Sequence, residues 1–93
     1  MLAQDLAIDD LMHALKDKDF KAAREWVAKN RDADPHLLYR KIYDTLYDYI
    51  QPASIPELVL LLGQYQFQTS QVIDPEIQMA AFTVEVMGSI GFK

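Results

Sequence analysis

Apolar residues recur along the first part of the chain at three- and four-residue steps, the spacing that lines up one face of an α-helix. A first helix over about residues 3–16 is predicted by five of them, Leu6, Ile8, Leu11, Met12 and Leu15. Residues 17–19 interrupt this pattern, and Asp19 can cap the next helix by accepting hydrogen bonds from its free N–H groups. That second, short helix has one apolar face, made of Phe20, Ala23, Trp26 and Val27.

A third helix is predicted over about residues 35–50. It begins at Asp34-Pro35, an N-cap residue followed by proline at the first helical position. Its apolar face contains Leu38, Ile42 and Leu46, with Tyr49 or Ile50. Beside that face lies a stripe of tyrosines at four-residue steps, Tyr39, Tyr43 and Tyr47. Such a stripe could stack nucleic-acid bases, but the acidic residues beside it favour packing in the core or in an interface.

Two later segments are apolar almost all the way round. They are residues 56–67, which follow a Ser54–Glu57 capping box, and residues 76–87, which follow Asp74-Pro75. A helix that is apolar on most sides is normally buried on most sides. A chain of 93 residues has little material with which to cover two such helices. We therefore expect another copy of the chain, or a related subunit, to cover them, which is the pattern of an assembly module.

The whole chain reads as one helical domain. No segment shows the alternation of a β-strand, and no Gly- or Ser-rich linker divides the sequence. We predict an all-α protein, a compact bundle of about five helices in a single domain over residues 1–93. Nine residues are predicted in or near its core: Leu11, Leu15, Trp26, Leu38, Ile42, Leu46, Leu61, Phe82 and Val86. The Trp26 ring could instead lie at the rim with its indole N–H in water.

Charge and composition argue against nucleic-acid binding, secretion and membrane insertion. The net charge is −5, and no lysine or arginine lies between Ile42 and Phe92. Phosphate binding needs clustered basic side chains, whereas the basic residues of segment 16–31 are interleaved with acidic ones, which favours a solvated face. We expect no direct binding to nucleic acid. With no cysteine, no signal-peptide pattern and no aliphatic run long enough to span a bilayer, we expect a cytoplasmic protein without membrane contact.

Residues with catalytic or ligand-binding potential are few. His13 and His36 have no second histidine or carboxylate at a metal-binding spacing. Asp44 and Asp48 lie one helical turn apart, but an ordinary surface ion pair between Arg40 and Asp44 is the better interpretation. No glycine-rich phosphate loop is present in the sequence. We therefore predict no catalytic, cofactor-binding or metal site, no cofactor, no small-molecule substrate and no enzymatic activity of the chain itself.

Landmarks from about Leu6 onward resemble the C-terminal collar domain of clamp-loader ATPase subunits of the replication factor C type. The resemblance is closest to the DNA polymerase clamp-loader subunit of T-even-like tailed phages. The matching segments are residues 11–20 (LMHALKDKDF), 42–47 (IYDTLY), 51–56 (QPASIP), 63–67 (GQYQF), 74–81 (DPEIQMAA) and the closing pair Phe92-Lys93. Each segment is a pattern of helix ends and apolar positions, and it is their shared order and spacing that carries the resemblance.

This resemblance implies a bundle of about five helices that packs against the collars of neighbouring subunits in a closed ring. The ring holds the ATPase domains so that ATP can open and load the sliding clamp. The implied partners are further copies of this chain and a second clamp-loader subunit. The chain lacks the Walker A lysine, the Walker B carboxylates and the Ser-Arg-Cys motif of the family, so ATP hydrolysis would belong to residues outside it. A fragment of a longer subunit is the favoured interpretation, and a collar-like protein standing alone is the alternative.

Contacts with a neighbouring subunit are expected from a subset of the large apolar residues on the last two helices. The candidates are Leu58, Val59, Leu62, Tyr65, Phe67, Ile77, Met79, Val84 and Met87. Two other classes of function stay open. One is a stand-alone helical adaptor that binds an unrelated partner through the face of residues 58–67. The other is a small enzyme or regulatory protein with a ligand cavity, which would need convergent polar groups around a compact pocket.

Overall fold

The computed structural model describes residues 7–69 and 74–93. Its helices are α1 (Ile8–Lys16), α2 (Phe20–Lys29), α3 (Pro35–Asp44), the single turn α4 (Leu46–Tyr49), the short 3₁₀ helix η1 (Pro52–Ser54), α5 (Ile55–Thr69) and α6 (Pro75–Ser89). Within the described residues the only β pairing is an isolated antiparallel bridge between Ile50 and Phe92. The predicted all-α bundle of about five helices is confirmed.

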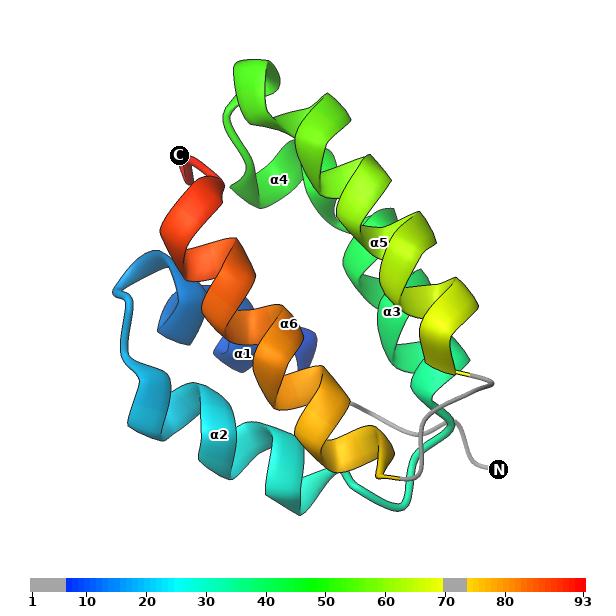
Figure 1. Cartoon of the computed structure of the whole chain (residues 1–93). Coiled ribbons are helices and arrows are strands. Elements are labelled where there is room, and N and C mark those ends of the chain that lie inside the picture. The colour runs from blue at the N-terminus through cyan, green and yellow to red at the C-terminus, as the bar shows by residue number, and fades with distance from the viewer. Residues whose placement is uncertain (1–6, 70–73) are drawn as a thin grey trace.

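Helix α6 lies between α2 and α5 (Figure 1). On one side it packs against α1 and α2, and on the other side against α5, which in turn packs against α3. The hydrophobic core fills the space between these helices. None of the helices in the described part of the chain is long and apolar enough to cross a membrane.

Aspartate caps fix where three of the helices begin. The side chains of Asp19, Asp34 and Asp74 each accept a hydrogen bond from a backbone N–H in the first turn of α2, α3 and α6, over 3.1, 2.9 and 3.0 Å. Proline occupies the first position of α3 and of α6, where its missing N–H costs nothing. The predicted starts of these helices are confirmed, because capping depends on residues close together in sequence.

The prediction of a single helix over residues 35–50 is wrong, because α3 ends at Asp44 and Thr45 separates it from α4. The backbone N–H and the hydroxyl of Thr45 both donate to the Ile42 carbonyl, over 3.1 and 3.0 Å. An uninterrupted α-helix would use that carbonyl to accept from the N–H of residue 46. A threonine side chain that competes for backbone groups in this way is a common reason for a helix to stop. Leu46 then starts the separate turn α4.

All nine residues predicted in the core are buried. Phe82 lies at the centre with no exposed surface, and its ring meets the rings of Tyr39 and Tyr65 edge to face, at centroid distances of 5.4 and 5.2 Å. The Trp26 ring is buried as well. Phe20, predicted on the apolar face of the second helix, is 41% exposed, because it stands at the very start of α2.

The indole N–H of Trp26 is bonded within the protein. It donates to the carbonyl of Ala7 over 3.1 Å, which ties the residue before α1 to α2. Ala7 has a φ of 49°, in the left-handed region that residues with a Cβ rarely adopt. Helix α1 begins at Ile8, so of the helix predicted over residues 3–16 only the part from Ile8 is confirmed. Residues 3–6 lie outside the described residues.

The C-terminal segment forms hydrogen bonds with the residues between α4 and α5. Beyond the bridge of Ile50 with Phe92, the N–H of Gln51 donates to the Gly91 carbonyl over 2.9 Å. The Gly91 N–H donates to the hydroxyl of Ser54, also over 2.9 Å. The predicted capping box of Ser54 is therefore wrong, because its hydroxyl accepts a hydrogen bond from a residue far away in sequence. The 3₁₀ helix η1 leads directly into α5.

Candidate interaction surface

The nine candidate interface residues divide into three groups in the structure. Leu58, Leu62 and Met79 are buried in the chain's own core, so they do not belong to the exposed part of the expected interface. Tyr65 and Met87 are half-buried and pack against that core. The other four are exposed by 38 to 70%: Val59, Phe67, Ile77 and Val84.

Helix α5 has two apolar faces. Its inner face is closed by Leu58, Leu61 and Leu62, which are at most 7% exposed. On its outer side Leu60 and Phe67 are 74% and 70% exposed. They stand seven residues apart with Gly63 between them, a spacing that lines up residues on one side of a helix. We call Val59, Leu60, Gly63 and Phe67 the α5 face.

Leu60 was absent from the predicted interface residues, although it is among the most exposed apolar side chains of the protein. The signal that could have found it is its helical position. Leu60 lies three residues before Gly63 and seven before Phe67, and it is rotated by about half a turn from the buried pair Leu58 and Leu62. In a helix that is apolar on all sides this signal cannot be recognised, because every face of the helix contains apolar residues at helical spacing.

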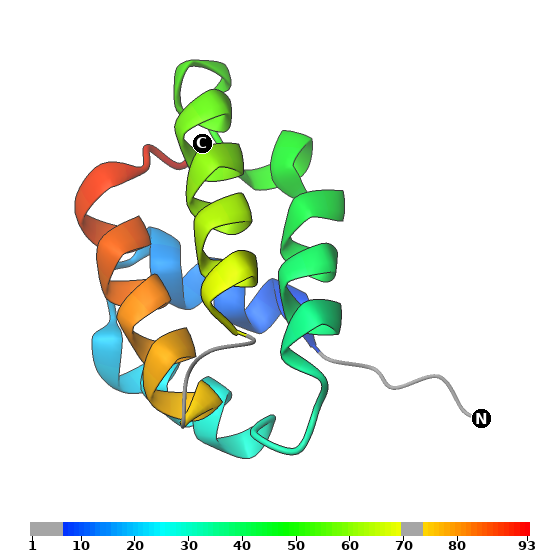
Figure 2. The ribbon, with the colours of Figure 1, turned by 45° about the vertical axis from the view of Figure 1, so that its right-hand side comes forward.

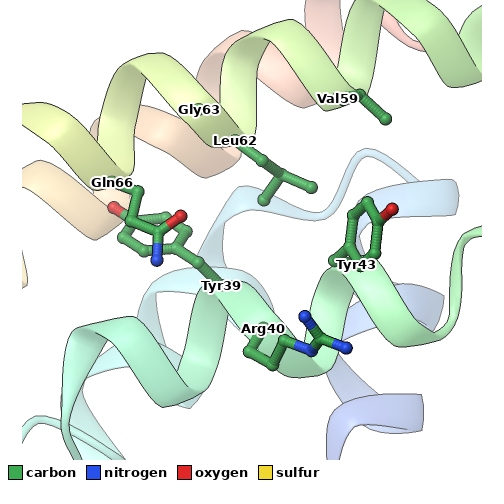
Figure 3. Close-up of a pocket in the computed structure, with 7 residues that line it drawn as sticks. All are labelled: Tyr39, Arg40, Tyr43, Val59, Leu62, Gly63 and Gln66. Atoms are coloured by element: carbon green, nitrogen blue, oxygen red, sulfur yellow. The ribbon is translucent and has the colours of Figure 1, made fainter.

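A groove of about 290 Å³ runs along one edge of the α5 face, between α3 and α5. Figure 3 shows Val59 and Leu62 of α5 opposite Tyr39 and Tyr43 of α3, with Arg40 and Gln66 as the polar members of the lining. At Gly63, a Cβ would meet no atom within 4 Å, so the groove is open there. The lining is mostly apolar and has few polar groups, which suits an apolar side chain of a partner better than a polar substrate.

The outer side of α6 is also apolar, with Ile77 and Val84 exposed by 67% and 53%. Ala81 and Gly88 stand at the same helical spacing and are exposed too. Helices α5 and α6 lie side by side in both views of the ribbon (Figures 1 and 2). The two adjacent helices therefore each present apolar surface to solvent.

A polar contact joins α5 to α6 between these outer surfaces. The hydroxyl of Tyr65 donates to a carboxylate oxygen of Glu85 over 2.7 Å. Burial of the Tyr65 ring, this hydrogen bond and the Glu85 charge raise the pKa of Tyr65 to about 12. Apart from Glu57 and Glu76, no other charged side chain stands on α5 or α6. The exposed face of this helix pair therefore contains carboxylates and no cation.

Arg40, the cation that lines the groove, contacts two other residues of α3. Its Nε lies 3.2 Å from a carboxylate oxygen of Asp44, the ion pair predicted from the sequence, and its guanidinium lies 5.4 Å from the centroid of the Tyr43 ring. Both members of the pair are well exposed, so the pair adds little to stability. Its effect is to hold the Arg40 side chain against Tyr43 at the edge of the groove.

Residues considered for chemistry are dispersed. The tyrosine stripe divides, because Tyr39 is buried against Phe82 while Tyr43 and Tyr47 are exposed. His13 is exposed, and its ring meets the edge of the Tyr49 ring at 5.9 Å. The described residues contain no group of three or more His, Asp or Glu side chains that could hold a metal ion.

The basic side chains of the first two helices and their loops are all exposed. They are Lys16, Lys18, Lys21, Arg24, Lys29 and Arg31. None of them forms an ion pair with a residue that the structure describes. Within residues 16–32 these six basic residues stand beside four acidic ones, whereas residues 42–92 contain six acidic residues and no basic one. The charge of the protein is therefore distributed unevenly between α1–α2 and the later helices.

A scan against protein-family models gives no match, and a search of curated proteins gives none either.

Proposed function

We propose that this chain is an oligomerisation module, the collar domain of a DNA-replication clamp-loader subunit. In this function the bundle binds copies of itself and a second clamp-loader subunit. It thereby holds the ATPase domains of the subunits in a ring in the cytoplasm while the sliding clamp is loaded. The chain contributes binding surface alone, and the chemistry of ATP belongs to residues outside it.

The observation that carries the proposal is the exposure of Leu60 and Phe67 on the outer side of α5, at 74% and 70%. Burying a large apolar side chain is worth roughly 1.5–3 kcal/mol. A small bundle gains from covering such residues, and its own core is already closed by the inner face of the same helix. The helical architecture and the order of the sequence landmarks agree with a collar, and the apolar outer surface supplies a reason for the collar to assemble.

Sedimentation velocity over a range of concentrations tests the assembly part of the proposal. The wild-type chain is expected to self-associate, and a Leu60→Gln/Phe67→Gln double variant is expected to remain monomeric while its helical circular dichroism is unchanged. A Leu37→Gln variant is the matched control, because Leu37 is also exposed but lies on α3. A wild-type chain that stays monomeric at about 1 mM, far above the Kd of a specific interface, would contradict the proposal.

The clamp-loader part has its own test, which also separates it from a stand-alone adaptor. The gene upstream of residue 1 should encode, in frame, a nucleotide-binding module with a Walker A lysine. The chain should also co-purify with the second clamp-loader subunit when the two are co-expressed, and the Leu60→Gln/Phe67→Gln variant should weaken this co-purification. Self-association without either result would favour an adaptor.

A further inference from the structure

The groove between α3 and α5 has a fixed floor and an open side. Tyr39 and Leu62, which are 2% and 5% exposed, form its floor, and the Tyr39 ring is held by its edge-to-face contact with Phe82. Gly63 leaves one wall without a side chain, since a Cβ there would meet no atom within 4 Å. The volume of about 290 Å³ is at the lower limit of pockets that enclose a whole ligand. The space is therefore suited to one large side chain.

Aromatic rings line the α3 side of this groove. Figure 3 shows Tyr39 and Tyr43 along α3, with the side chain of Leu62 reaching from α5 toward the space between them. A further aromatic ring favours edge-to-face or offset contact with such rings, which adds to the gain from burying it. An aromatic side chain is therefore the apolar group that this lining holds best.

Arg40 is the one charged residue among the described residues that line the groove. A guanidinium has five N–H donors, one on Nε and four on the two terminal nitrogens. The Nε of Arg40 lies 3.2 Å from Asp44, and the terminal nitrogens form no hydrogen bond or ion pair with a described residue. Figure 3 shows the guanidinium turned toward Tyr43. Arg40 can therefore donate to an incoming carboxylate without losing its contact with Asp44.

The charges around Arg40 favour a partner with a single carboxylate. Asp44 has a side chain that is 49% exposed, and it does not line the groove. Lys41, the next residue of α3, is exposed and adds a second positive charge to this helix. Asp48 of α4 and Glu57 of α5 are outside the lining as well. The groove itself is therefore positive, whereas the net charge of −5 opposes a partner with many carboxylates.

We propose that this groove binds a short segment of a partner protein in which a phenylalanine precedes an acidic residue. The ring enters the groove beside the two tyrosines and Leu62. The adjacent carboxylate accepts two hydrogen bonds from the terminal nitrogens of Arg40, the paired geometry that arginine and carboxylate favour. The amide of Gln66, which forms no hydrogen bond with a described residue, can donate to the backbone of the segment. This site is separate from the proposed self-association, because it does not use Leu60 or Phe67.

Nuclear magnetic resonance titration of the full, isotope-labelled chain tests the proposal. The probe is a blocked tetrapeptide, acetyl-Ser-Phe-Asp-Ser-amide, and the amide signals of residues 39–43 and 59–66 are expected to shift and saturate together. Two matched peptides replace its aspartate by asparagine or its phenylalanine by alanine. The asparagine peptide should bind at least about tenfold more weakly, the effect of losing a hydrogen bond to a charged group. The alanine peptide should bind no more tightly than that.

Substitutions in the protein locate the binding. Arg40→Gln should weaken binding of the aspartate peptide by at least about tenfold and leave the asparagine peptide unaffected. Lys41→Gln removes the same charge outside the lining and should change the affinity by less than about threefold, since isolated surface charges contribute little. Asp44→Asn should strengthen binding, because it removes an anion that competes for Arg40. Gly63→Leu fills the groove and should abolish binding while helical circular dichroism is retained.

Several results would overturn the proposal. One is the absence of a saturable shift at about 5 mM peptide, a concentration above the Kd of a weak specific contact. Another is equal binding of the aspartate and asparagine peptides, or equal losses in Arg40→Gln and Lys41→Gln. Phenylpropionate that binds as tightly as the peptide would make the groove a site for small aromatic acids instead. Shifts that grow with protein concentration alone would assign the groove to a second copy of the chain.

The titration is independent of the test of the proposed function. Repeating it in the Leu60→Gln/Phe67→Gln variant should give the same affinity, because neither residue lines the groove. A wild-type chain that binds the peptide but never self-associates would remove the oligomerisation function and keep this site. A chain that self-associates but does not bind the peptide would do the reverse.

Discussion

The helix pairs α1–α2 and α5–α6 belong to one bundle, but they expose different kinds of residue to solvent. On the outer side of α2 stand charged residues such as Lys21 and Arg24, whereas the outer side of α5 exposes Leu60 and Phe67. The α1–α2 pair thus has one apolar side and one solvated side, as expected for a helix at the surface of a monomer. The α5–α6 pair has apolar residues on both sides. Residues of the same type therefore have different roles within α5–α6, and substitutions can separate these roles.

The largest expected effect comes from a pair of phenylalanines in α5–α6. Phe82→Ala should lower the free energy of unfolding by about 3–5 kcal/mol, because it leaves a cavity where a fully buried ring contacts Tyr39 and Tyr65. Phe67→Ala removes a ring that is 70% exposed and should change the same quantity by less than about 1 kcal/mol. Urea unfolding of dilute protein measures both. Similar losses at the two positions would mean that the outer side of α5 is covered within the monomer.

A smaller loss is expected in α1–α2 from Trp26→Phe. The substitution removes the indole N–H that donates to the Ala7 carbonyl and leaves space beside α1, so it should lower the free energy of unfolding by about 1–2 kcal/mol. Phe20→Leu, at an exposed position of the same helix, is the control and should have little effect. If Trp26→Phe proved as mild as the control, the tie between Ala7 and α2 would not contribute to stability.

Two glycines should respond in opposite directions to substitution by alanine. Gly63→Ala should raise the free energy of unfolding by about 0.5–1 kcal/mol, because a Cβ meets nothing within 4 Å there and alanine favours a helix. Gly91→Ala should lower it, since a Cβ would lie 2.9 Å from the Gln51 Oε1 and 3.3 Å from the Ser54 Oγ. Thermal unfolding compares the two variants, and changes of the same sign would contradict this description.

The smallest expected effect is a loss of stability at alkaline pH. The pKa of Tyr65 is raised to about 12 in the folded protein, from an ordinary value of 10.0. Between these values the folded state binds more protons than the unfolded state, so stability falls as pH rises from about 10 to about 12 and is unaffected by this group below that range. The raised pKa of Tyr49, also about 12, acts in the same direction.

Urea unfolding at a series of pH values from about 9 to about 11.5, within the range where the two states differ in bound protons, measures this effect. Tyr65→Phe should make the fall with pH shallower, because one of the two tyrosines no longer titrates. An equally steep fall in the variant would show that Tyr65 does not hold its proton more tightly in the folded state.

Local signals explain which parts of the fold could be predicted from the sequence. The caps Asp19, Asp34 and Asp74 act on N–H groups two or three residues away, so their role is visible in the sequence. Core positions in helices with a single apolar stripe, such as Leu11 and Leu38, follow from spacing and were predicted correctly. The all-α class and the starts of α2, α3 and α6 could therefore be predicted from these two signals.

Other features depend on residues far apart in sequence. Ser54 looks like half of a capping box, but its hydroxyl accepts from the N–H of Gly91, which no local pattern indicates. In α5 the apolar residues surround the helix, so spacing alone could not distinguish the buried Leu58 from the exposed Leu60. Three of the candidate interface residues, Leu58, Leu62 and Met79, face the core, and an interface on these two helices stays a prediction.

The position of α4 has a consequence for how the protein folds. Tyr49, in this single turn, bonds through its hydroxyl to Asp9, 40 residues earlier, and through its carbonyl to the N–H of Lys93. Contacts between such distant residues require large loops to close before they contribute any stability. We therefore expect the middle of the chain to reach its final structure only after α1 and the C-terminal segment are in place. Weakening either contact should mainly accelerate unfolding, because interactions formed late in folding stabilise the native state more than the transition state.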